Sequence, residues 1–148
     1  MPRRPLITSI MTKFLLPLFF TIFITASTHA AGSKPEEVAR AAADEWLALV
    51  DAGKFVESWQ KLDPGFAKKV SKKKLTASLA QIRAPLGQLG ARKLQSAEYT
   101  KELSGAPEGE YVVLRFDSAF ERKKPAIEKV TMLLGKDLLW RAAGYSVK

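Results

Sequence analysis

The chain has 148 residues, with 24 Lys or Arg against 15 Asp or Glu, and its formal net charge is +9. A hydrophobic share of 47% and a charged share of 26% are typical of a globular protein, and the length suits one domain. The chain contains no cysteine and one histidine, His29, which excludes disulfides, thiolate nucleophiles and Cys-ligated metal centres and argues against a histidine-dependent hydrolase.

Residues 1–30 have the three parts of a secretory signal peptide. The start is basic, with Arg3 and Arg4, residues 14–25 are apolar and uncharged, and small residues surround a cleavage position after Ala30. The apolar stretch is shorter than the roughly 20 residues that cross a bilayer. We therefore expect cleavage near Ala30 and export to the periplasm or the medium. An uncleaved N-terminal anchor is the alternative.

Cleavage would change the charge and the chemistry of the protein. Residues 1–30 hold three basic residues, no acidic residue and the single histidine, so residues 31–148 would carry +6 and no histidine. These 118 residues are enough for one hydrophobic core without disulfides. We expect them to form a single domain.

Three helices are predicted in the first half of that domain. Ser33 and Glu36 have the spacing of a capping box, and the helix behind them ends at Gly53. A short second helix stops near residues 63–65, and Ser71 caps a third. The apolar positions expected on the first and third helices are Val38, Ala42, Trp46, Leu49, Val50, Leu75, Leu79, Ile82 and Leu86.

Four strands are predicted after the helices. Their short, turn-like connections favour antiparallel neighbours, because a parallel pair needs a crossover of about a dozen residues. Helices followed by a meander predict an α+β fold with the helices on one face of the sheet. The expected strands are residues 92–103, 110–120, 126–134 and 138–147.

Alternation along these strands assigns side chains to the two faces of the sheet. The predicted inner face carries Val112, Leu114, Phe116, Phe120, Val130, Met132, Leu134, Leu138, Trp140 and Ala142. The predicted outer face carries Tyr111, Val113, Arg115, Ile127, Leu133, Leu139, Tyr145 and Val147. This outer face is too apolar to lie fully in water, so a homodimer through it is one expectation.

The mature chain contains a series of distinctive blocks, namely residues 45–55, 58–59, 83–87, 96–100, 105–114, 128–131 and 140–145. In this order the blocks resemble the family known as domain of unknown function 4019. The resemblance implies a small exported bacterial domain, similar in shape to the nuclear-transport-factor-2-like (NTF2-like) or cystatin-like α+β folds. It implies no activity, because none is attached to the family, and fold analogy alone cannot supply one.

Glu128 is the candidate catalytic residue. By alternation it shares the inner face with Val130 and Met132, where an acid must be paired or have a raised pKa. A carboxyl with a raised pKa inside a cone-shaped fold suits a general base, with Arg83 as its partner. The alternatives are a solvated Glu128 at the rim and a structural pair with Arg83.

Three aromatic residues are candidates for a ligand pocket. Trp46, Tyr99 and Tyr111 could line one, because ligand pockets are apolar with a few polar groups. At these helical and strand spacings the alternative is that they belong to the core. The sequence offers no motif for a cofactor and no set of metal ligands, so we expect neither.

A basic run is the candidate anion-binding site. Nucleic acid is disfavoured as its partner, because export separates the two and no interleaved aromatics offer base stacking. Anionic lipid headgroups or envelope polymers are better partners, and a solvated face is the alternative. The run consists of Lys68, Lys69, Lys72, Lys73 and Lys74.

The sequence thus favours a non-catalytic binding or interaction module of the bacterial envelope, with a small molecule or an envelope protein as its partner. One alternative is a small acid–base enzyme, isomerase-like or hydratase-like, that uses an inner carboxylate. Another is a basic adaptor for anionic envelope surfaces.

Overall fold

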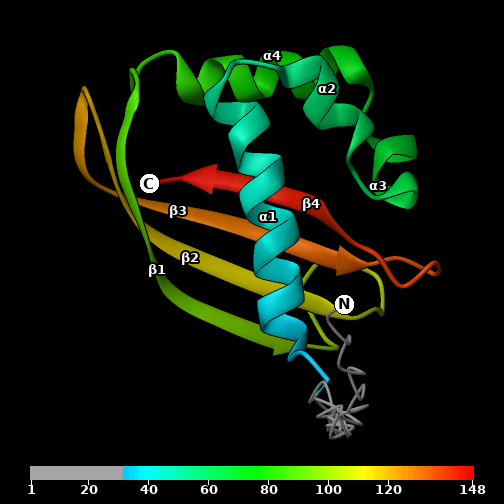
Figure 1. Ribbon diagram of the computed structural model, residues 1–148. Coiled ribbons are helices and arrows are strands. Elements are labelled where there is room, and N and C mark those ends of the chain that lie inside the picture. The colour runs from blue at the N-terminus through cyan, green and yellow to red at the C-terminus, as the bar shows by residue number, and fades with distance from the viewer. Residues whose placement is uncertain (1–31) are drawn as a thin grey trace, which may run out of the picture. The chain divides into compact units, whose positions relative to one another are not determined.

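The computed structural model describes residues 32–148, which form four helices followed by four strands (Figure 1). The predicted signal peptide, residues 1–30, lies outside the described residues. The elements are α1 (Pro35–Asp51), α2 (Phe55–Gln60), α3 (Pro64–Lys69), α4 (Lys72–Arg83), β1 (Leu89–Thr100), β2 (Tyr111–Phe120), β3 (Lys123–Leu134) and β4 (Trp140–Val147).

The four strands form one antiparallel sheet in the order β1-β2-β3-β4, and α1 runs across one face of it (Figure 1). This is the predicted α+β meander with helices on one face. The strand limits agree within a few residues, with one local error: residues 123–125, predicted as a turn, begin β3. The turn before β3 is confined to Glu121 and Arg122.

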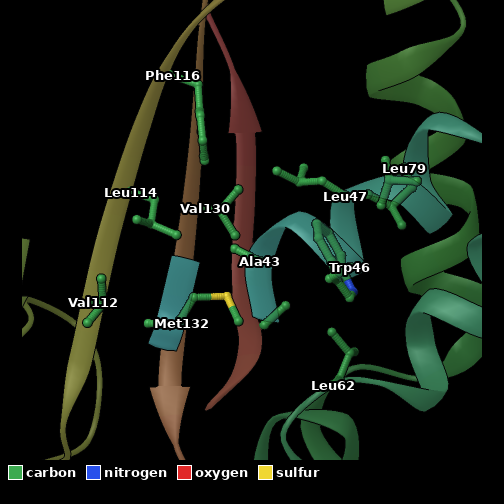
Figure 2. Packing of buried hydrophobic residues seen from close by; sticks show 13 residues of the cluster. Ala43, Trp46, Leu47, Leu62, Leu79, Val112, Leu114, Phe116, Val130 and Met132 are labelled. Carbon is green, nitrogen blue, oxygen red and sulfur yellow. The ribbon is translucent and has the colours of Figure 1, made fainter. Parts of the chain in front are cut away.

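The core lies between α1 and the inner face of the sheet. Figure 2 shows Val112, Leu114, Val130 and Met132 pointing from the strands toward α1. The residues of helix α1 that are buried in this core are Ala39, Ala43, Trp46, Leu47 and Val50.

The buried face of α1 is rotated relative to the predicted one. The prediction placed Val38, Ala42 and Leu49 in the core, but Val38 is 44% exposed and the other two are only half-buried. The small side chains of Ala39 and Ala43 face the sheet instead, so the helix can approach the strands closely. The displaced apolar side chains line a surface groove described below.

The residues predicted to begin and end the helices do so in the structure, with one exception. Gly53 adopts φ 71 just after α1, and the Ser71 hydroxyl accepts a hydrogen bond from the Lys74 amide at 3.3 Å, both as predicted. The predicted capping box is wrong. Helix α1 starts at Pro35, so Lys34 is the N-cap and Ser33 lies one residue too early to cap it.

Helix α3 was not predicted, because Asp63-Pro64-Gly65 has the composition of a turn. The Asp63 side chain instead accepts a hydrogen bond from the Phe66 amide at 3.0 Å, and Pro64 occupies the first helical position. Both residues favour a helix start as strongly as a turn.

A β-bulge in β4 changes which side chains face the core. Thr131 pairs with Gly144 and Met132 with Ala142, so Ala143 is the extra residue. Beyond the bulge, Tyr145 lies opposite Val130 on the inner face.

Four assignments to the faces of the sheet are wrong. Tyr145 and Val147, predicted on the outer face, face inward, because the bulge reverses the alternation. Leu138, predicted on the inner face, lies in the turn before β4 and is 77% exposed. Leu139, predicted on the outer face, lies in the same turn and lines the groove beside α1.

The outer face of the sheet exposes less apolar surface than the sequence suggested. Tyr111 and Val113 are buried there, at 3% and 8% exposure. The exposed large hydrophobic residues of the described chain are Val38, Val56, Leu138 and Leu139, and none of them lies within a strand. The homodimer through the outer face stays a prediction.

Candidate functional site: a buried ionic cluster

Two acids and two arginines meet between the helices and one end of the sheet. Glu128 comes from the inner face of β3, Arg92 from β1, Asp51 from the last position of α1 and Arg83 from the last position of α4. The fold therefore joins residues of α1, α4, β1 and β3 that extend from position 51 to position 128 of the sequence.

Glu128 is completely buried and receives four hydrogen bonds. Arg92 donates from Nε to Oε2 at 2.6 Å and from Nη2 to Oε1 at 3.0 Å. Ser118 Oγ donates to Oε2 and Tyr145 OH to Oε1, each at 2.6 Å. An ionised carboxylate accepts about four hydrogen bonds, so its capacity is used within the protein.

Arg92 also binds Asp51 with its other edge. Its Nη1 lies 2.8 Å from Asp51 Oδ2, and its Nη2 lies 3.0 Å from Asp51 Oδ1. One guanidinium thus bridges two carboxylates through geometry that only an arginine provides.

Arg83 completes the cluster from the helical side. Its Nη1 lies 2.8 Å from Asp51 Oδ1, 3.2 Å from Tyr145 OH and 3.5 Å from Glu128 Oε1. Its guanidinium carbon lies 4.7 Å from the centre of the Phe120 ring, which adds a cation–π contact. The four charged groups sum to zero, which is how a buried cluster of charges is tolerated.

The protonation states follow from these contacts. Burial alone would raise the pKa of Glu128, but hydrogen bonds from Arg92, Ser118 and Tyr145 and the charge of Arg92 outweigh it, so the pKa lies below its ordinary value. Burial and the negative charge of Glu128 raise the pKa of Tyr145. Burial would lower the pKa of Arg92, but its bonds to Asp51 and Glu128 raise it.

Glu128 is therefore ionised and paired, which was one of its two predicted states. The direction of its pKa is opposite to the raised value that would suit a general base. Arg83, its predicted partner, is in the cluster, but the closer guanidinium is that of Arg92.

An open pocket adjoins the cluster. It has a volume of about 400 Å³, and Asp51 and Arg83 form part of its wall. Phe55 and Val50 supply apolar surface, and Arg122 from the β2–β3 turn also lines the pocket, with its Nη2 2.8 Å from the Ala84 carbonyl oxygen. The pocket therefore combines apolar and charged surface.

A second hollow lies between α1 and the β3–β4 hairpin. This groove, of about 620 Å³, is lined by two tryptophans, Trp46 and Trp140, and by apolar residues of both walls. Three of the four exposed large hydrophobic residues of the described chain line it, namely Val38, Leu138 and Leu139.

The three aromatic ligand candidates do not come together. Tyr99 lies on the inner face of β1, and its OH donates to Glu110 at 2.7 Å, which raises its pKa. Tyr111 lies on the outer face and donates to the Pro107 carbonyl oxygen at 2.7 Å.

Of these three candidates, Trp46 lines the α1–hairpin groove, and Tyr99 and Tyr111 line neither of the two hollows described above. Its ring is otherwise held in the core. Nε1 donates to the Ser58 carbonyl oxygen at 3.1 Å, and the ring packs edge-on against Tyr145 at 5.6 Å between centroids.

The lysine candidates are exposed but do not share one helix. Lys68 and Lys69 end α3, Lys72 to Lys74 begin α4, and Val70 and Ser71 separate the two helices. The positive charge of these five lysines is therefore divided between the end of α3 and the start of α4.

The sequence interpretation missed Asp51, Arg92, Ser118 and Tyr145. Arg92 and Ser118 alternate with inner-face apolar residues, Leu94 and Phe116, so their positions carried a usable signal. Tyr145 carried none, because the bulge at Ala143 reverses its side.

Residues 32–148 contain no group of three or more His, Cys, Asp or Glu residues placed to hold a metal ion. In the same part of the chain, no helix is long and apolar enough to cross a membrane.

A family model described as a protein of unknown function (DUF4019) matches residues 42–145. No curated protein and no solved structure matches the chain. The α+β fold is therefore established by the structure itself, and the similarity to NTF2-like or cystatin-like shapes remains an expectation.

Proposed function

Because the chain belongs to the DUF4019 family, whose function is unknown, we propose a function from the site: an exported, non-catalytic binding module of the bacterial envelope. The observation that carries this proposal is that hydrogen bonds within the protein use all the acceptor positions of the Glu128 carboxylate. Its four hydrogen bonds leave the carboxylate no place for a substrate proton, and its lowered pKa makes it a weak base.

The ionic cluster is better suited to holding a binding surface in shape. Asp51 ends α1 and Arg83 ends α4, and their contact fixes two helix ends beside the open pocket. Within the described chain, every buried side-chain nitrogen or oxygen has a hydrogen-bond partner. A fully satisfied polar network of this kind makes its surroundings rigid.

Turnover distinguishes a binding module from the acid–base enzyme. A thermal-shift screen against envelope metabolites should find compounds that raise the melting temperature, because a ligand of the native state stabilises it. Each hit is then incubated with the protein and with Glu128→Gln, and the compound is analysed by mass spectrometry. We expect every hit to be recovered unchanged. A hit that the natural protein converts, and that Glu128→Gln does not convert although circular dichroism shows this variant folded, would establish the enzyme instead.

Export is supported by the signal-peptide pattern of residues 1–30 and is tested separately. Mass spectrometry of the protein from fractionated cells should find a periplasmic or secreted form that begins at or next to Ala31. An intact N-terminus in the cytoplasmic fraction would contradict export, and one in the membrane fraction would indicate the uncleaved anchor.

A further inference from the structure

The turn between β3 and β4 carries two adjacent leucines in an unusual state. Leu138 is 77% exposed and Leu139 is 55% exposed. Leu138 also adopts φ 61, in the left-handed region that residues with a Cβ rarely occupy. The backbone of the turn holds it there, since its amide donates to the Gly135 carbonyl oxygen at 2.9 Å.

Glycine is the usual residue for such a position. A leucine there costs stability through the backbone conformation, and its mostly exposed side chain gains little burial in return. A local cost of this kind points to a use for the side chain outside the fold. Two further residues support such a use, because Leu139 and Val38 are also exposed and line the same groove as Leu138.

The surroundings of the turn are basic. Lys136 lies in the turn itself, and Lys61 lines the groove with the leucines. Helix α3, which ends in Lys68 and Lys69, starts beside β4. The Asp63 amide donates to the Ala142 carbonyl oxygen at 3.3 Å, and Figure 1 shows α3 and the β3–β4 hairpin toward the same end of the sheet, at the right of the view.

These cations are available for a partner. Within residues 32–148, none of the four lysines pairs with a carboxylate. The acid of the turn, Asp137, is already held by Arg141 through contacts of 2.6 and 2.8 Å. Among the residues that line the groove, Glu45 is the acidic one. The lysines therefore give this side of the hairpin a positive balance.

We propose that Leu138 and Leu139 insert into an anionic phospholipid surface, with Lys61, Lys68, Lys69 and Lys136 contacting its headgroups. Reversible attachment to a membrane needs an apolar anchor together with a basic patch, and this side of the hairpin supplies both. A second copy of the chain fits less well, because it would bring the same unpaired lysines close to one another. The proposal gives the binding module a partner and rests on its location in the envelope.

Vesicle co-sedimentation tests the proposal with the protein as isolated from cells. We expect binding to phosphatidylglycerol-rich vesicles, weak binding to phosphatidylcholine vesicles, and a decrease as salt screens the lysines. Replacing Leu138→Gly and Leu139→Ser together should weaken the partition constant about a hundredfold, roughly tenfold for each side chain. Lys136→Gln should weaken it about fivefold.

Val56→Ser is the matched control. Val56 is 45% exposed on α2 and does not line the groove, so its replacement should leave vesicle binding unchanged. The double-leucine variant should also stay folded, because glycine suits the left-handed position better than leucine. If its melting temperature is maintained, its loss of binding cannot come from unfolding.

Three outcomes would overturn the proposal: no binding to anionic vesicles, equal binding by the double-leucine variant, or equal, salt-insensitive binding to both vesicle types. A dimer in light scattering that the double-leucine variant abolishes, without vesicle binding, would assign the surface to a second copy. The proposed function would survive each of these results, because the thermal-shift screen and the mapping of the N-terminus test it independently.

Discussion

Arg92 reaches Glu128 with two of its nitrogens, Nε to Oε2 at 2.6 Å and Nη2 to Oε1 at 3.0 Å, across the inner face of the sheet. This pairing explains how a carboxylate with no exposed surface remains charged in the core. Because Arg92 also holds Asp51, the pairing ties β1 and β3 to the end of α1. The cluster is thus a structural junction at the wall of a pocket.

Replacing Glu128→Gln should destabilise the protein strongly. The substitution leaves Arg92 without its main buried partner, and breaking a buried ion pair from one side costs about 3–5 kcal/mol. Urea unfolding followed by circular dichroism measures the loss. Glu98→Gln, on an exposed position of β1, is the control and should change the free energy of unfolding by about 0.5 kcal/mol or less. Equal effects of the two substitutions would show that the cluster contributes nothing to stability.

Stability should decrease in acid partly through Glu128. Its pKa is lower in the folded state than in the unfolded state, where it is near 4.5, so its contribution is fully present above pH 4.5. The contribution is lost as the pH falls through the folded-state pKa. The free energy of unfolding, measured from pH 7 downward, should therefore fall more steeply for the natural protein than for Glu128→Gln. Asp137, whose pKa is lowered to about 2 by Arg141, titrates in both proteins, so the difference between the two curves isolates Glu128. Parallel curves would contradict this account.

Tyr145→Phe should cost about 1.5–3 kcal/mol, because it removes a hydrogen bond to a charged carboxylate without opening a large cavity. The phenol of Tyr145 should also be the last to ionise, since burial and Glu128 raise its pKa. An ultraviolet titration should therefore lose its latest transition in Tyr145→Phe. Tyr111→Phe, which removes a bond to a neutral carbonyl, is the comparison and should keep that transition. A Tyr145 that titrates with an ordinary pKa would show that its hydroxyl is not bound to Glu128.

Leu138→Gly should keep or raise the stability of the fold. The left-handed backbone costs a residue with a Cβ about 1–2 kcal/mol, and glycine avoids most of that cost. Thermal unfolding of Leu138→Gly beside Leu138→Ala separates the backbone effect from the loss of the side chain, since alanine keeps the Cβ. A glycine variant that is less stable than the alanine variant would contradict the left-handed conformation.

Most of the fold could be predicted from local sequence patterns, namely the alternation of apolar and polar residues along the strands and the lengths of the connections. Alternation along β2 and β3 placed Phe116 and Glu128 on the inner face correctly, and short connections predicted the antiparallel order. The errors arise where one residue changes the pattern. The extra residue Ala143 moves Tyr145 to the inner face, and the Asp63 side chain makes a helix start from an apparent turn.

The candidate site was predicted less completely than the fold. Burial of Glu128 required a cation, and Arg83 was a reasonable partner because it ends a helix near the core. The choice between Arg83 and Arg92 depends on how far β1 curves toward α1 and on the bulge near Gln95, which local patterns do not encode. The exposed state of Leu138 was hidden for a similar reason, because the turn before β4 extends two residues further than its composition indicates.

The most direct test of a structural, non-catalytic Glu128 is titration of its own carboxyl carbon by nuclear magnetic resonance, assigned by comparison with Glu128→Gln. We predict a midpoint below the ordinary glutamate pKa of 4.5, with the carboxylate ionised throughout the neutral range. A midpoint raised from 4.5 toward neutrality would contradict it, because a general base works best when its pKa lies near the pH at which it operates.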